Sequence, residues 1–138
     1  NRYLGEVGRK PFVWGELDCF LFVADWVERV TGIDPAGEYR GAYTNVREAR
    51  NLIRSRGGPL LFAGTMLSRA GGVVVQIPGP GDVALVRAAL SRHGERIILI
   101  PVGAICVRPD MWAIKPGGPG SLTLGNFPMI QSWRLNHG

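Results

Sequence analysis

The stretch PFVWGELDCFLFVADW, residues 11–26, holds a cysteine whose chemistry depends on the helix predicted to follow it. Cys19 comes after Asp18, a residue type that caps helices, and before an apolar run with helical period. In the first turn of a helix, unpaired N–H groups and the helix dipole favour the thiolate, the nucleophilic form of cysteine. Cys19 is therefore a candidate nucleophile. The spacing alone favours a second interpretation, a small side chain in the core, because free cysteines are among the most buried residues.

A thiol nucleophile also needs an imidazole within hydrogen-bond reach. The chain has two histidines, His93 and His137. His93 falls in a predicted hairpin turn, so it is a weak candidate for the base and, on the simpler interpretation, a solvated turn residue. His137 is next to the last residue, where chain ends fray. With Cys106 as the second cysteine, the sequence has neither a disulfide framework nor metal-ligand spacing. We expect two free thiols, no metal and no cofactor.

Three helices are predicted to position these residues. The first begins at Asp18 or Cys19 and ends where Gly32 can adopt a left-handed conformation. The second runs from about 45 to 56, and the third, with a proline in its first turn, runs from 59 to 70.

After Gly72 the pattern changes to short β-branched or alternating runs bounded by glycine and proline. The segment ALSRHGER is predicted as the hairpin turn between the second and third strands. Helices followed by a strand meander predict one α+β domain over 1–138, in which helices at about 18–71 pack on an antiparallel, partly barrel-like sheet at about 73–136. The predicted strands are 73–77, 83–86, 96–100, 102–107, 112–115, 121–124 and 132–135.

The composition favours a soluble, single-domain protein. The chain has 138 residues, 46% of them hydrophobic, and no apolar stretch approaches the roughly 20 residues of a membrane span. The net charge of +5 suits polyanions or acidic partners. A dedicated nucleic-acid reader is disfavoured, because the sequence has no lysine or arginine run and no basic patch interleaved with aromatics. Four arginines of the second helix are interpreted as a solvated face or a contact to acidic subunits: Arg47, Arg50, Arg54 and Arg56.

Several segments, in order along nearly the whole chain, resemble the NlpC-type cell-wall cysteine peptidases, which are papain-like. The segments are FVWG at 12–15 followed by DC at 18–19, PGDVALV at 80–86, VGAICV at 102–107 and WAIKPGGPG at 112–120. Three further segments, DWVERVTGIDP, YRGAY and SWRL, are most similar in sequence to small relatives of this superfamily encoded in phage and prophage tail modules. Those relatives resemble tail-tip or tail-assembly components.

The resemblance assigns Cys19 the role of nucleophile, at a helix tip facing the sheet. It also shows a departure from the family pattern. The position of the family's catalytic histidine is Pro101, which can neither accept nor donate a proton. The polar residue that orients the histidine would fall near Ile114 or Lys115, and neither accepts a hydrogen bond from an imidazolium. At the positions that the resemblance assigns to the base and to the residue that orients it, the sequence therefore has no suitable side chain. Asp18 is no substitute, since a neighbouring carboxylate raises the pKa of a thiol.

Four further residues are candidates for a binding cleft, and each has a structural alternative. Trp14 is a cleft wall or a packing anchor, and Gly15 belongs to the cleft or to a tight turn. Asp18 borders the cleft or serves as the helix cap. Asp82 could orient reacting groups, but a Pro-Gly-Asp turn leading into a strand is the simpler interpretation.

Three function classes follow, in order of preference. The first is a structural component of a phage tail tip, built on a cysteine-peptidase-like fold that has lost its base. The second is an active peptidoglycan cysteine endopeptidase that uses Cys19 with a non-standard base such as His93. The third is a polyanion- or nucleic-acid-binding module. The first class implies other tail proteins as partners, synthesis in the bacterial host cytoplasm and a place in the virion tail. Peptidoglycan is the partner in the second.

Overall fold

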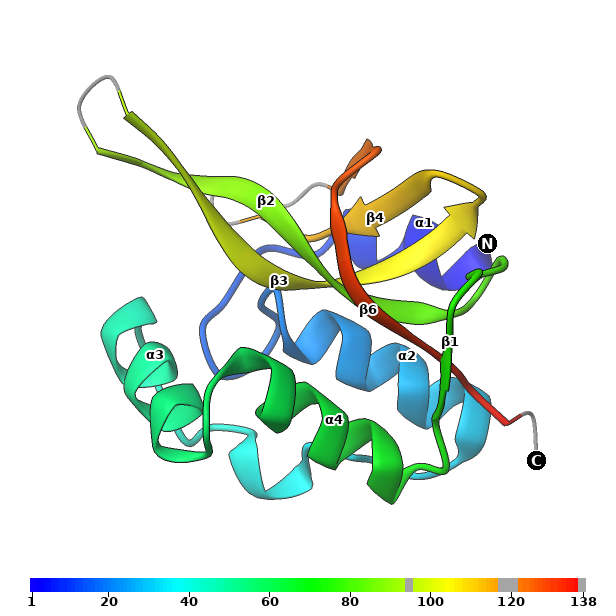
Figure 1. Ribbon diagram of the computed structural model, residues 1–138. Helices are drawn as coiled ribbons and strands as arrows, with labels where there is room; N and C mark the ends of the chain where they lie inside the picture. Colours follow the sequence, from blue (N-terminus) through cyan, green and yellow to red (C-terminus); the bar gives the residue numbers. More distant parts are fainter. Residues whose placement is uncertain (94–95, 117–121, 137–138) are drawn as a thin grey trace.

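The computed structural model describes residues 1–93, 96–116 and 122–136 (Figure 1). Helices come first: α1 (Arg2–Gly8), α2 (Leu21–Thr31), the 3-10 turn η1 (Gly37–Tyr39), α3 (Val46–Ser55) and α4 (Pro59–Arg69). Strands follow: β1 (Val73–Val75), β2 (Val83–His93), β3 (Arg96–Arg108), β4 (Met111–Ile114), β5 (Thr123–Gly125) and β6 (Met129–Arg134). The predicted α+β class is confirmed.

The three predicted helices are present, with one informative shift at the start of α2. The helix begins at Leu21, and the Asp18 carboxylate caps it from outside by accepting the N–H groups of Phe20 at 2.9 Å and Leu21 at 2.8 Å. Cys19 therefore lies in the turn that leads into the helix and not in its first turn. Gly32 ends α2 in the left-handed conformation, at φ 79°.

Helix α1 was not predicted, because seven residues give too little periodicity to detect. The Asn1 side chain caps it, and Tyr3 and Val7 bury its inner face. Its C-terminal end is held by Lys115, whose ammonium donates to the carbonyl oxygens of Val7 at 3.2 Å and Lys10 at 2.8 Å.

The sheet has six strands in the order β1-β6-β2-β3-β4-β5, and every pair is antiparallel. It is open between β1 and β5, so the expectation of a partly barrel-like sheet is wrong for the part of the chain that the structure describes. The expected meander is wrong at one edge, because β6 inserts between β1 and β2. The Ser132 hydroxyl reinforces this pairing by donating to the carbonyl oxygen of Val75 at 2.8 Å.

Two strand boundaries also differ from the prediction. The segments expected at 96–100 and 102–107 form one strand, β3, which runs through Pro101. Proline is tolerated here because β3 pairs only with β2 at this point, and β4 first pairs at Ile105. Most of the predicted turn ALSRHGER is strand, since β2 continues to His93. The tip at 94–95, the predicted strand start at Ser121, and His137 lie outside the described residues.

The outer halves of β2 and β3 form a two-stranded arm that projects from the body of the molecule (Figure 1). Residues 88–93 pair with 96–100, and the described residues supply no other strand partner to either segment. We call this segment the hairpin arm.

Helices α2 and α4 lie along one face of the sheet (Figure 1). The approach of α2 is closest at Gly103 of β3, where a Cβ would lie 2.8 Å from Val23 Cγ2 and 3.0 Å from the carbonyl oxygen of Cys19. Only a residue without a side chain permits this contact. It sets how near the turn carrying Cys19 lies to β3.

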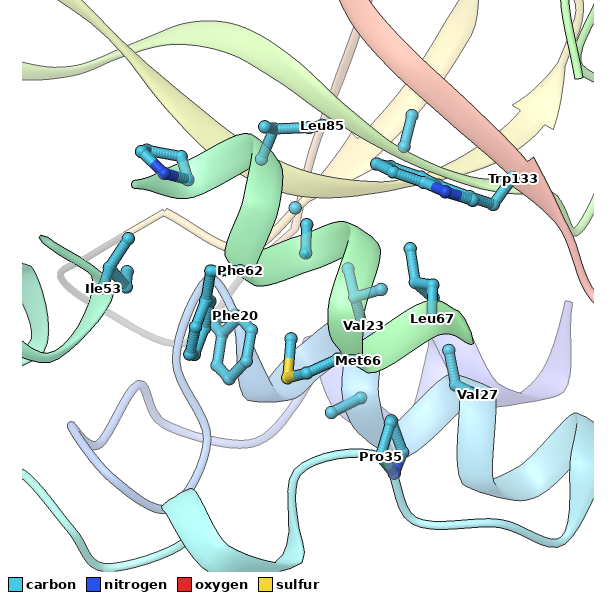
Figure 2. A pocket seen from close by; sticks show the side chains of 15 residues that line it. Phe20, Val23, Val27, Pro35, Ile53, Phe62, Met66, Leu67, Leu85 and Trp133 are labelled. Carbon is cyan, nitrogen blue, oxygen red and sulfur yellow. The ribbon is translucent and has the colours of Figure 1, made fainter. Parts of the chain in front are cut away.

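An apolar cavity of about 60 Å³ remains between α2, α4 and the sheet. Figure 2 shows side chains from both helices pointing into it, with Leu85 and Trp133 closing it from the strands. Its lining side chains are apolar apart from the indole N–H of Trp133, so the space belongs to the core. Among the residues with described positions, no helix is long and apolar enough to cross a membrane.

Candidate functional site

Cys19 borders a surface hollow of about 320 Å³ that we call the Cys19 hollow. Three parts of the chain form it: the turn before α2, the α3 segment with the start of α4, and β3. Its lining residues are Trp14, Cys19, Val46, Ala49, Arg50, Ile53, Arg54, Gly58, Pro59, Ile100 and Pro101. The hollow therefore brings together the candidate nucleophile, one predicted cleft residue and the strand position at which the resemblance places a base.

Asp18 is fully buried beside the hollow, and its carboxylate is saturated with hydrogen bonds. Besides the two amides at the start of α2, it accepts the N–H of Gly15 at 3.0 Å and the hydroxyl of Tyr43 at 2.6 Å. Burial and this carboxylate raise the pKa of the Tyr43 hydroxyl well above its usual range. Asp18 thus serves as cap and anchor of the turn, and it is not among the residues lining the hollow.

The Cys19 thiol is held in its protonated form. Burial, and next the negative charge of Asp18, raise its pKa to about 12. Of the two interpretations of Cys19, the raised pKa favours the small buried side chain over a thiol activated by the helix terminus, because burial and the Asp18 charge both oppose the thiolate. Cys19 keeps partial contact with solvent, and both it and Cys106 are free thiols, as predicted.

Pro101 lines the same hollow as Cys19, so the position assigned to the base does lie near the thiol. Its ring has no group that accepts a proton. The position assigned to the orienting residue is also without an acceptor. Ile114 is a buried hydrocarbon, and the Lys115 ammonium is committed to the C-terminal end of α1.

Trp14 and Gly15 have different roles. The Trp14 indole packs against Phe12, with ring centroids 4.8 Å apart, and forms part of the hollow. Gly15 is buried in the turn, at φ 83°, where a Cβ would lie 2.2 Å from the Tyr43 carbonyl oxygen. The tight-turn interpretation of Gly15 is therefore the one that its geometry fits.

Asp82 and the backbone of His93 both lie far along the sheet from Pro101. Asp82 accepts the N–H of Gly79 at 2.8 Å and pairs with Arg134 at 2.9 Å, next to Cys106. Cys106 is five residues beyond Pro101 on β3, or about 16 Å along an extended strand. The backbone of His93 ends the hairpin arm, six residues beyond the residue that pairs with Pro101, or about 20 Å. Asp82 does not line the hollow.

The part of the hollow that sequence reasoning missed comes mainly from α3. Its lining includes Val46, Arg50 and Arg54, which the pattern placed on a helix of unknown position. The amphipathic period of this segment could predict a packed face, but no sequence signal says that the packed face lies beside Cys19. In the described ranges, no group of three or more His, Cys, Asp or Glu residues is arranged to hold a metal ion.

The fold and the site define a class: an α+β domain with helices on an open antiparallel sheet and a protonated thiol that borders a surface hollow. The chain belongs to the DUF6950 family, described as a domain of unknown function, whose model matches residues 1–135. A search of curated proteins and a search of solved structures find no match to this chain.

Proposed function

We propose that this protein is a structural component of a phage or prophage tail tip, built on an NlpC-like cysteine-peptidase fold without peptidase activity. The tail assignment is based on the sequence resemblance. The lack of activity is supported by one observation above the others: Pro101 and Cys19 line the same hollow. The strand position assigned to the base is thus near the thiol and carries no base.

Thiol attack on an amide requires a group that takes the thiol proton and then returns a proton to the leaving amine. Loss of a positioned acid and base typically costs about 100- to 10,000-fold in rate. The raised pKa of Cys19 adds to this cost, because little thiolate is present near neutral pH. Both effects favour a scaffold over a hydrolase.

The proposal is tested by incubating purified protein with peptidoglycan and measuring soluble muropeptides by liquid chromatography. We expect wild type and Cys19→Ala to release the same background amount. Release by the wild type that Cys19→Ala abolishes would overturn the proposal in favour of the endopeptidase alternative. A parallel loss in His93→Ala would then identify the base.

The structural role has its own test. We expect the wild-type chain and the Cys19→Ala variant to co-purify equally with tail particles from a lysate of the encoding phage or prophage. Absence of the wild-type chain from purified tails would contradict the tail assignment, whatever the outcome of the muropeptide assay.

A further inference from the structure

We propose that the Cys19 hollow is a docking site for a peptide segment of a neighbouring protein, in which a carboxylate side chain stands next to an apolar one. That the neighbour is a tail subunit rests on the proposed function. The binding chemistry comes from the hollow itself.

The apolar half of the site is built from three different parts of the chain. Trp14 comes from the turn before α2, Ile100 and Pro101 from β3, and Val46 from the start of α3. Val46 keeps 48% of its surface exposed in the free chain, although it borders a concave site. Covering such surface with an apolar side chain removes it from water and favours binding.

The charged half consists of Arg50 and Arg54, which are exposed, lie one turn apart on α3 and both line the hollow. Within the described residues neither forms an ion pair, whereas Arg29, Arg40, Arg69 and Arg134 all do. The one acidic residue of α3, Glu48, is occupied with the backbone N–H and the hydroxyl of Thr44.

Among the described residues, these two guanidinium groups have no carboxylate partner, and they stand beside an apolar concave surface. Arginine forks bind carboxylates with two parallel hydrogen bonds, and arginine is enriched at the energetic centre of protein interfaces. A partner with acidic and apolar side chains next to each other satisfies both halves at once.

The dimensions favour a peptide over a nucleic acid. A volume of about 320 Å³ is at the small end of ligand pockets, which hold about 300–1,000 Å³. It suits a few side chains. Single-stranded nucleic acid is bound by a basic groove that follows the backbone over several nucleotides. This hollow offers two cations on one side and apolar groups elsewhere.

The test is affinity selection of an N-acetylated, C-amidated random hexapeptide library on the immobilised full-length protein at low ionic strength, read by mass spectrometry. We expect the retained peptides to be enriched in Asp or Glu adjacent to Leu, Ile, Met or Phe. A retained peptide, resynthesised with fluorescein, should bind Arg50→Gln/Arg54→Gln about tenfold more weakly than wild type, since both charge pairs are lost.

The matched control is Arg2→Gln/Arg108→Gln, which removes the same charge from exposed residues on α1 and at the end of β3 that do not line the hollow. Its affinity, measured at about 0.15 M salt, should stay within about twofold of wild type, because exposed charges farther away than the Debye length of about 8 Å are screened. The indole N–H signal of Trp14 should shift in the ¹H–¹⁵N spectrum when the peptide binds, with assignment from Trp14→Phe.

Several outcomes would overturn the inference: no retained peptide, retained peptides without acidic residues, equal weakening in the two double variants, or an unmoved Trp14 signal. Binding of a single-stranded oligonucleotide in place of peptides would favour a polyanion-binding module. Peptide binding together with Cys19-dependent muropeptide release would retain the docking chemistry and reject the proposed function. If neither peptide binding nor muropeptide release is found, the docking inference is rejected and the proposed function is retained.

Discussion

The surroundings of the Cys19 thiol should make it a slow nucleophile. Burial and the Asp18 charge raise its pKa to about 12, so near neutral pH it holds far less thiolate than an ordinary cysteine. We expect alkylation by iodoacetamide to be correspondingly slow in the folded chain and to accelerate as the pH rises toward 12. Peptide-level mass spectrometry of timed reactions measures this rate without a mutation.

The same chain unfolded in urea supplies the control, since both cysteines should then react at the rate of a small-molecule thiol. A folded-state rate profile with its midpoint near or below pH 8 would contradict the structural account. It would mean that an unrecognised cation or base stabilises the thiolate.

Gly15 tests whether the turn before α2 is held by backbone geometry. At φ 83°, with the Tyr43 carbonyl oxygen 2.2 Å from a Cβ position, alanine is both strained and obstructed. We expect Gly15→Ala to lower the free energy of unfolding by about 2 to 4 kcal/mol, as measured by urea denaturation.

Gly5 of α1 provides the matched substitution, because a Cβ there has no atom within 4 Å. Gly5→Ala should stabilise the chain by up to about 1 kcal/mol through helix propensity. Equal effects at the two positions would show that the turn is not constrained as described.

At the scale of elements, the buried ammonium of Lys115 links α1 to β4 and gives the stability a pH dependence. Burial lowers the pKa of Lys115 below 10.5. Between the folded and unfolded pKa values the folded chain binds fewer protons than the unfolded chain, so the free energy of unfolding rises with pH up to about 10.5. In Lys115→Met this contribution disappears.

The measurement is urea denaturation of both proteins between pH 7 and pH 10.5. Tyr3 and Tyr43, whose raised pKa values make stability fall above about pH 10, are present in both chains and cancel in the difference. The difference, wild type minus Lys115→Met, should increase with pH. A constant difference would mean that the ammonium is solvated.

The hairpin arm should be the least protected part of the sheet. Residues 88–93 and 96–100 pair only with each other among the described strands, while 83–86 pair with both β3 and β6 and Ile105 pairs with both β2 and β4. Isolated two-stranded ribbons are marginally stable in water. Hydrogen exchange followed by mass spectrometry should therefore show faster exchange in the arm, and equal protection would indicate that another surface covers it.

Most elements were predictable because caps and periodicity act locally. Asp18, Gly32 and Pro59 mark helix ends through their own backbone chemistry, and the structure uses each of them accordingly. The insertion of β6 beside β1 was not predictable, since pairing partners far apart in sequence leave no local signal. The outer part of the arm was predicted as a turn because its polar residues are typical of loops, and the sequence does not show that they pair with a neighbouring strand.

At the scale of the whole molecule, one core joins the helical and strand halves. Tyr3 of α1, Phe22 of α2, Leu67 of α4 and Trp133 of β6 belong to the same buried cluster. We expect a single cooperative unfolding transition, with far-ultraviolet circular dichroism and tryptophan fluorescence coincident in urea. Separate transitions would divide the helical part from the sheet and contradict the prediction of one domain.

The site was predictable only in part, because its lining residues come from segments that are far apart in the sequence. The order of segments placed Trp14, Cys19 and Pro101 in one region through resemblance, and all three line the hollow. The position of α3 depends on how two loops pack, so Arg50 and Arg54 could not be assigned to the same place. The direction of the thiol pKa depends on burial, which a sequence pattern does not report.

The contact at Gly103 has a consequence for the ancestry of this site. It brings the turn of Cys19 close to the strand that carries Pro101 through a backbone contact that does not involve the side chain at position 101. Proline and histidine codons differ at a single position when the third base is a pyrimidine. One point mutation can therefore put an imidazole at a strand position that lines the same hollow as Cys19. Proline and histidine at position 101 therefore differ by one codon, and exchanging them does not require a different fold.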